Sequence, residues 1–125
     1  MSTILLIDDE EGIRNYIKVL LEHAGHGVVL AENGAKGLEI CQYYNPDLII
    51  TDLIMTSTDG LTVLRKMRER DPYIPIIAMT GGDPVFDSSH LLAVALIEQA
   101  DVLLKKPFSC EELLESVRKL TSEEL

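Results

Sequence analysis

Short apolar segments alternate along the whole chain with longer amphipathic ones. Four of the apolar segments are continuous and rich in β-branched residues: 4–7, 47–51, 75–79 and 102–104. This pattern is typical of strands that are buried on both faces of a parallel sheet. A weaker fifth segment, 27–30, lies between the first two in the chain and is expected at an edge of the sheet.

The amphipathic segments carry apolar residues at helical spacing. Such faces are formed by Ile13, Ile17, Leu20, Leu21 and Ala24, by Leu61, Leu64 and Met67, and by Leu113, Leu114, Val117 and Leu120. A capping box from Ser109 to Glu112 predicts where the last helix begins. Because strands that alternate with helices indicate an α/β fold with a parallel sheet, we predict five strand–helix units in one domain, residues 1–125.

The segment 91–97 is apolar at every position, and such a run fits a buried strand as well as a helix. Its place between two predicted strands favours a helix. A helix that is apolar all round cannot bury every side against one sheet. Its outer surface is therefore either a protein contact or a small patch with Ala93 and Ala95 facing outward, and the sequence leaves both interpretations open.

The composition narrows the possible functions. The chain has 125 residues, a formal charge of −10 and a pI near 4.6, which disfavours direct binding to nucleic acid or anionic lipid. Its only cysteines are Cys41, expected in the core, and Cys110, and they are too few for a disulfide scaffold. No run approaches the roughly 20 apolar residues of a membrane span. We expect a reduced, cytoplasmic protein that binds a divalent cation or a basic patch on a protein partner.

Polar residues stand where four of the predicted strands end. Asp8 and Asp9 follow the first strand, Asp52 ends another, and Thr80 and Lys106 follow the last two. Ligands of open parallel sheets bind beyond the carboxyl ends of the strands, so these groups are expected to converge. Taken alone, the first acidic run is better explained as a solvated helix start. The coincidence at all four strand ends instead indicates a site for a divalent cation and a phosphoryl group.

The chemistry of these groups suggests roles. Carboxylates about 4 Å apart repel by roughly 4 kcal/mol at an effective dielectric constant near 20, so they either take up protons or bind a cation such as Mg²⁺, which prefers oxygen ligands. Asp52 is a candidate nucleophile, since aspartate can form an acyl phosphate. Lys106 would neutralise phosphoryl oxygens and Thr80 would donate a hydrogen bond to one. The histidines have no metal-ligand spacing, and no nucleotide-binding glycine motif is present.

With these motifs in place, the whole chain resembles a response regulator receiver domain, the CheY-like module of two-component signalling. Residues 4–10 resemble the family's acidic pair after its first strand, and 46–52 resemble the strand that ends in the phosphoacceptor. Thr80 and the segment 106–108 also fall where the family shows its hydroxyl and its lysine with a following proline. The resemblance implies a flavodoxin-like fold: a single doubly wound sheet of five parallel strands, in the order 2-1-3-4-5, flanked by five helices.

The resemblance also implies a cofactor and its ligands. Asp52 would be the phosphoacceptor, and Asp9 and Asp52 would ligate Mg²⁺ directly. Asp8 would do so through water, and the Ile54 backbone carbonyl would complete the protein's share. Thr80 would hold the phosphoryl oxygens together with the lysine after the last strand.

The remaining implications concern partners and output. The donor would be a phosphohistidine on a sensor histidine kinase or a histidine phosphotransfer protein, or acetyl phosphate. The domain would catalyse only its own phosphorylation and slow dephosphorylation. The Lys106–Pro107 bond is expected to be cis. The phosphorylated conformation would be read by a downstream protein, or by a second copy in a homodimer, on the fourth helix, the last strand and the last helix.

Three features depart from the family pattern. Leu103 occupies the switch position that is usually Tyr or Phe, so the usual coupling from the threonine to an aromatic side chain is not expected. The segment 56–58 replaces a common proline, and the segment 81–89 is longer than usual and contains Phe86, a possible substitute aromatic.

Two other functions stay open. One is a receiver-like interaction module that acts independently of phosphorylation, which Leu103 favours. The other is a Mg²⁺-dependent phosphohydrolase with an aspartyl-phosphate intermediate, for which no cap segment is present. Only a few residues follow the last helix, so we expect no output domain within this chain. It would act as a stand-alone regulator, a phosphate shuttle or the receiver of a longer protein.

Overall fold

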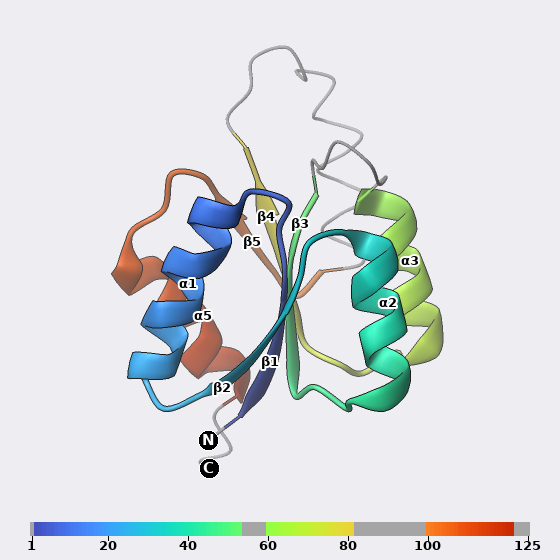
Figure 1. Cartoon of the computed structure of the whole chain (residues 1–125). Helices are drawn as coiled ribbons and strands as arrows, with labels where there is room; N and C mark the ends of the chain where they lie inside the picture. Colours follow the sequence, from blue (N-terminus) through green and yellow to red (C-terminus); the bar gives the residue numbers. More distant parts are fainter. Residues whose placement is uncertain (1, 54–59, 82–99, 122–125) are drawn as a thin grey trace.

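Five parallel strands form one sheet in the order β2-β1-β3-β4-β5 (Figure 1). The strands are Thr3–Ile7 (β1), Gly27–Ala31 (β2), Leu48–Asp52 (β3), Ile76–Thr80 (β4) and Val102–Lys105 (β5). The computed structural model describes residues 2–53, 60–81 and 100–121. Both the predicted strand order and the edge position of β2 are confirmed.

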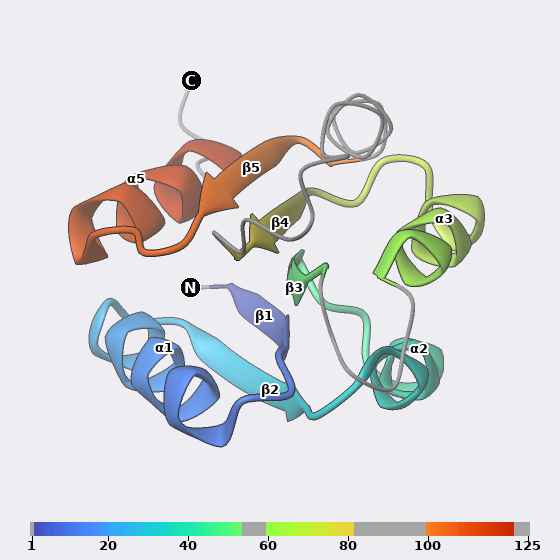
Figure 2. The same ribbon diagram turned by 90° about the horizontal axis from the view of Figure 1, so that it is seen from above.

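Helices cover both faces of the sheet. They are Glu11–His23 (α1), Gly34–Tyr43 (α2), Gly60–Arg70 (α3) and Cys110–Thr121 (α5). The view along the sheet shows α1 and α5 against one face and α2 and α3 against the other (Figure 2). These are the four helices within the described residues, and the predicted helix at 91–97 lies outside them.

Each face of the sheet has its own apolar core, because successive strand residues point to opposite sides. Leu6 and its neighbours on one face pack with Ile17 of α1 and Val117 of α5. Leu5 and its neighbours on the other face pack with Met67 of α3. The apolar residues of β1, β3 and β4 are all buried, which confirms that these strands are covered on both faces.

The same prediction was wrong for β5. Only Leu104 of this strand is fully buried, and Leu103 is 38% exposed. β5 pairs with β4 alone and forms the second edge of the sheet, so its alternate residues are less covered. The apolar run at 102–104 therefore has one buried face rather than two.

Local signals set the ends of the helices. Ser109 and Glu112 form the predicted capping box: Glu112 N–H donates to Ser109 Oγ at 3.0 Å, and Ser109 N–H donates to a Glu112 carboxylate oxygen at 2.9 Å. At the end of α1, Gly25 has a φ of 97°. The N–H groups of Gly25 and His26 donate to the carbonyls of Glu22 and Leu21, a Schellman arrangement. Helix α1 thus ends earlier than predicted, and Ala24, expected on its buried face, is exposed.

Helix α2 contacts the sheet through a buried glycine. Asn33 caps it by accepting a hydrogen bond from Lys36 N–H at 2.8 Å. One turn further on, Gly37 is buried, and a Cβ at this position would overlap the side chain of Ile7. The absence of a side chain at Gly37 therefore lets α2 pack against the end of β1, immediately before the first acidic residue of the predicted site.

Candidate functional site

Strand pairing places the predicted polar residues at one edge of the sheet. Ile7, the last residue of β1, pairs with Thr51 of β3. The residues that follow them, Asp8 and Asp52, therefore lie side by side. Thr80 is the last residue of β4 and pairs with Lys105, the residue before Lys106. The carboxyl ends of four strands thus present the predicted groups on one side of the molecule.

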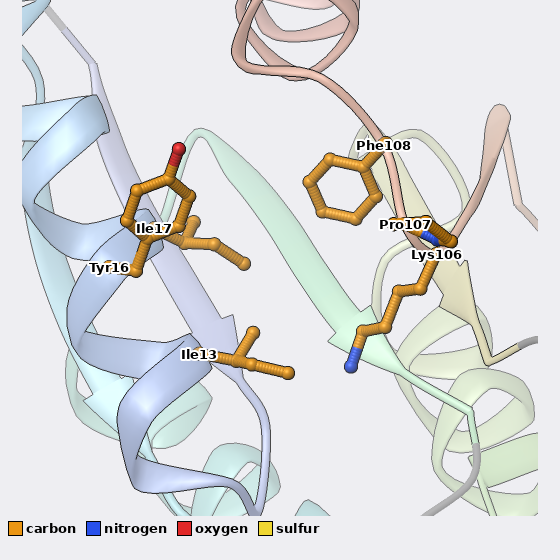
Figure 3. Close-up of a pocket in the computed structure, with 6 residues that line it drawn as sticks. All are labelled: Ile13, Tyr16, Ile17, Lys106, Pro107 and Phe108. Carbon is orange, nitrogen blue, oxygen red and sulfur yellow. The ribbon is translucent and has the colours of Figure 1, made fainter.

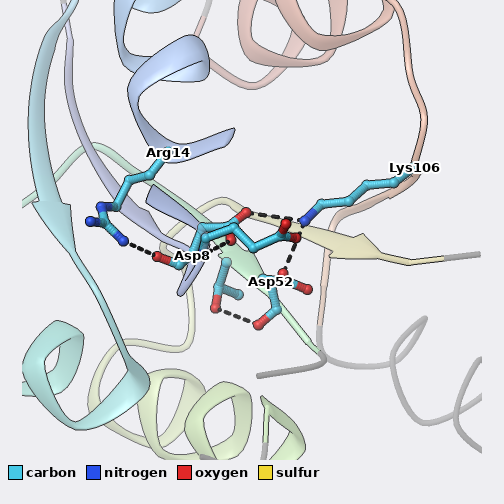
Figure 4. A network of polar contacts seen from close by, with 6 residues as sticks. Asp8, Arg14, Asp52 and Lys106 are labelled. Carbon is cyan, nitrogen blue, oxygen red and sulfur yellow. Dashed lines mark hydrogen bonds and ion pairs between the residues drawn. The ribbon is translucent and has the colours of Figure 1, made fainter. Parts of the chain in front are cut away.

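Lys106 bridges the two buried carboxylates (Figure 4). Its Nζ lies 3.1 Å from Asp8 Oδ2 and 3.0 Å from Asp52 Oδ2. Asp8 is 0% exposed and Asp52 is 3% exposed. Burial by itself lowers the pKa of the Lys106 ammonium group, but the hydrogen bonds and negative charges of Asp52 and Asp8 outweigh it, and the pKa is raised. Lys106 is therefore a fixed positive charge at this site.

Asp8 is held by several hydrogen bonds. Its Oδ1 accepts from Glu10 N–H at 2.9 Å, and its own N–H donates to the Ala31 carbonyl at 3.2 Å. Its backbone carbonyl accepts from Arg14 Nη1 at 2.7 Å (Figure 4). These bonds fix both the carboxylate and the backbone at the start of the loop between β1 and α1.

Asp9 completes a cluster of three carboxylates with Asp8 and Asp52. One carboxylate oxygen from each residue lies within 4.8 Å of the others. Three acidic side chains gather here beside the Lys106 ammonium group, which contacts two of them. Clustered carboxylate oxygens are the ligands that a hard divalent cation such as Mg²⁺ prefers. Ile54, expected to contribute a backbone carbonyl, lies outside the described residues.

Thr80 and Lys106 are linked through the backbone: Lys106 N–H donates to the Thr80 carbonyl at 2.7 Å. The side chain of Thr80 is half-buried at the end of β4. The Lys106–Pro107 peptide bond is cis. The segment 56–58, and the part of 81–89 that follows Gly81, including Phe86, lie outside the described residues.

Two features of the site were missed by the sequence analysis. The first is Arg14, whose only signal was a basic residue in the first turns of a helix, where acidic residues are favoured. The second is a pocket of about 440 Å³ beside Lys106 (Figure 3). It is lined by Ile13, Tyr16, Ile17, Lys106, Pro107 and Phe108. Its signal was an aromatic residue, Tyr16, on the polar side of α1, where it is 58% exposed.

A doubly wound sheet of order 2-1-3-4-5, with an acidic cluster and a lysine at its carboxyl edge, defines the CheY-like class of α/β protein. Comparison with known families agrees: the response regulator receiver domain model matches residues 4–118. The chain belongs to this family.

Individual relatives support the assignment. The transcriptional regulatory protein TrcR of Mycobacterium tuberculosis is 35% identical over 117 residues, which are 94% of this chain and 44% of that protein. Among solved structures, a receiver domain protein of Clostridium thermocellum has a TM-score of 0.84 and 32% identity, covering 97% of this chain and 94% of that one. The response regulator TrrA of Thermotoga maritima, solved in complex with Mg²⁺–BeF, has a TM-score of 0.81 and 35% identity, covering 96% and 99%.

Length and hydropathy add two further facts. The chain spans about half the length of the curated relatives it matches, for example 44% of TrcR. Within the described ranges, no helix combines the length and the apolar character that crossing a bilayer requires.

Proposed function

We propose that the chain is a phosphoacceptor receiver of a two-component system and that Asp52 is phosphorylated. The observation that carries this proposal is the position of Lys106, which donates to both Asp8 and Asp52 at the carboxyl edge of the sheet. A largely covered ammonium group beside a buried aspartate is suited to bind the negative charge that a phosphoryl group brings.

The residues of the site have distinct roles in this proposal. Asp9 and Asp52 would hold Mg²⁺ directly, Asp8 would do so through water, and the Ile54 carbonyl, which lies outside the described residues, would be the further ligand. The chemistry that bound Mg²⁺ supplies is charge neutralisation at the phosphoryl oxygens. The carboxylate oxygens of the three aspartates, clustered within 4.8 Å, support this ligand set.

In the transfer step, a carboxylate oxygen of Asp52 forms a bond to phosphorus as the bond from phosphorus to the donor breaks. The donor leaves with the bonding electrons, as acetate from acetyl phosphate or as an imidazole with a proton on its second nitrogen from phosphohistidine. Lys106 and the Thr80 hydroxyl bind the phosphoryl oxygens. Slow attack by water on phosphorus later releases inorganic phosphate and restores the aspartate.

The pocket in Figure 3 supports a protein phosphodonor. It lies between α1 and the segment after β5, next to the lysine of the site, and its walls are mostly apolar. We propose that an apolar helix face of a sensor kinase or phosphotransfer protein packs here, against Tyr16 and Phe108, and so brings its phosphohistidine to Asp52.

We propose that the contact with a downstream partner is made at the β5 edge of the sheet. Leu103, which is 38% exposed on β5, supports a contact through β5 and α5 with a downstream protein or a second copy. In this proposal the contact also includes the helix predicted at 91–97, which lies outside the described residues. Leucine cannot make the aromatic rotamer switch of the family, so Leu103 would act as a contact residue. We propose a cytoplasmic location, and the charge of −10 opposes nucleic acid binding by these residues.

Intact-protein mass spectrometry after treatment with acetyl phosphate tests the proposal. One phosphoryl group is expected in the presence of Mg²⁺ and none in EDTA or in Asp52→Asn. Asp47→Asn is the matched control, because Asp47 immediately precedes the first residue of β3, at the opposite edge of the sheet from Asp52. There it accepts a hydrogen bond from Thr3 N–H. A folded wild type that takes up phosphate from neither acetyl phosphate nor a phosphorylated histidine protein would instead favour the phosphorylation-independent module.

The docking proposal has its own test. Tyr16→Ser and Phe108→Ser should slow transfer from a phosphorylated histidine protein while leaving phosphorylation by acetyl phosphate unchanged. Tyr73→Ser is the control, since Tyr73 is 90% exposed in the loop between α3 and β4 at the other end of the sheet. Equal slowing with both donors would show that the pocket shapes the site rather than docks the partner.

A further inference from the structure

The guanidinium group of Arg14 contacts a backbone carbonyl of the site rather than one of its side chains. Its Nη1 donates to the carbonyl oxygen of Asp8 at 2.7 Å, and Figure 4 shows the guanidinium group directed at that oxygen. The arginine lies on α1 and is half-buried. The roles assigned above to the carboxylates, the threonine and the lysine do not include it.

A hydrogen bond to the Asp8 carbonyl also constrains the residue that follows. A peptide unit is planar, and the unit that contains this oxygen also contains the nitrogen and Cα of Asp9. Asp8 N–H is fixed by the Ala31 carbonyl and Asp8 Oδ1 by Glu10 N–H. The bond from Arg14 thus anchors the peptide that leads into Asp9, in a loop that lies outside both β1 and α1.

We propose that Arg14 is a positioning residue that raises the divalent-cation affinity of the acidic cluster by holding the Asp8–Asp9 peptide. This inference rests on the proposed function, because it requires Asp8, Asp9 and Asp52 to bind the cation. Partners that orient the ligands of a metal typically change its affinity by 10- to 100-fold when they are removed.

Because Arg14 is positively charged, a positioning role and an electrostatic role predict opposite changes in cation affinity when it is replaced by a neutral residue. A guanidinium group near the cluster repels a cation, so a purely electrostatic role predicts that a neutral residue at position 14 tightens cation binding. Positioning predicts the opposite. Arg14→Met, which removes both the charge and the donors, is therefore expected to weaken Mg²⁺ binding about tenfold.

The experiment is a titration of the whole folded chain with Mg²⁺ by calorimetry, repeated with Mn²⁺ by electron paramagnetic resonance. Arg14→Lys should give an intermediate affinity, because lysine retains the charge and a donor but lacks the planar guanidinium group. Arg70→Met is the matched control: Arg70 also donates from a helix to a backbone carbonyl, that of Cys41, but at the far end of the sheet. Its cation affinity should equal that of the wild type.

Phosphorylation provides a second readout. At saturating Mg²⁺ the rate of Arg14→Met with acetyl phosphate should return toward the wild-type rate, while at low Mg²⁺ it should lag. If Arg14→Met does not fold, the affinity of Arg14→Lys decides the question.

Three outcomes overturn the inference. In the first, Arg14→Met or, where that variant is unfolded, Arg14→Lys binds Mg²⁺ as tightly as the wild type or more tightly. In the second, Arg70→Met weakens binding equally, so that the effect is a general loosening of the helices. In the third, the wild type itself binds no divalent cation, and then the proposed function fails as well.

Discussion

Lys106 Nζ lies 3.0 Å from Asp52 Oδ2, although the two residues are 54 positions apart in the chain. The lysine follows the edge strand β5 and the aspartate ends the central strand β3, so the contact crosses the end of β4. The lysine side chain is 16% exposed and that of Asp52 is 5% exposed. An ion pair this buried is costly to break, because removal of one partner leaves the other charge without compensation.

Substitution of Lys106 should therefore lower stability. In metal-free buffer, Lys106→Met is expected to reduce the free energy of unfolding by about 3 kcal/mol, since it removes the ammonium group that donates to two buried carboxylates. Urea denaturation in EDTA measures this value, and added Mg²⁺ should recover part of the loss. A variant as stable as the wild type in EDTA would mean that the carboxylates are not both charged.

The pH dependence of the same pair has a definite sign. Hydrogen bonds and charges from the aspartates raise the pKa of Lys106 above its ordinary value of 10.5. The stabilisation is therefore fully present below that value and is lost as the pH rises through the higher pKa of the folded state. The difference in stability between wild type and Lys106→Met should stay constant from neutral pH to about pH 9.5 and shrink as the pH rises above the ordinary value of 10.5. A difference that already shrinks near pH 8 would contradict a raised pKa.

Removal of a charge from the cluster should have the opposite effect. In EDTA, Asp9→Asn is expected to raise the free energy of unfolding by about 1 kcal/mol, because it relieves repulsion among like charges. The variant should also lose most of the additional stability that the wild type gains from Mg²⁺, which depends on cation affinity. Thermal unfolding with and without Mg²⁺ measures both effects. Glu10→Gln is the control, since Glu10 is exposed and lies outside the cluster, and it should retain the response to Mg²⁺.

The strands and the convergence of the site were predictable because they depend on local pattern and on topology. The run at 4–7 lies within β1 (Thr3–Ile7), since residues buried on both faces leave a continuous apolar signal. Asp8 and Asp52 meet because parallel strands bring their carboxyl ends to one edge.

Two other features could not be predicted, because they depend on which elements pack against each other. The exposure of Leu103 follows from the edge position of β5. The contact from Arg14 to the Asp8 carbonyl depends on how α1 packs beside the loop that follows β1. No periodicity or motif encodes either relationship, because each depends on how separate elements pack.

His26 should make the fold sensitive to acid. Burial is the main cause that lowers the pKa of its imidazole, and among the described residues its Nδ1 is buried without a hydrogen-bond partner. The unfolded chain therefore binds a proton near the ordinary pKa of 6.5 while the folded chain does so only at lower pH. Stability is lost as the pH falls below that ordinary value. Between pH 7 and pH 5, urea denaturation should show a steeper loss for the wild type than for His26→Gln.

Gly12 and Gly37 provide a matched pair of helical glycines with opposite expectations. Gly12 lies in the first turn of α1, and a Cβ added there would have no heavy atom of another segment within 4 Å, so Gly12→Ala should raise the free energy of unfolding by about 0.5–1 kcal/mol. Gly37 faces Ile7, which is 0% exposed, and a Cβ added at Gly37 would lie 2.9 Å from Ile7 Cγ1. Gly37→Ala should therefore lower the free energy of unfolding by about 1–3 kcal/mol, the typical cost of overpacking. Because Ile7 immediately precedes Asp8, the same substitution should also weaken Mg²⁺ binding, whereas Gly12→Ala should not. If both alanine variants were stabilised, α2 would have room to move away from β1, and the close packing of α2 would not be a constraint on the acidic cluster.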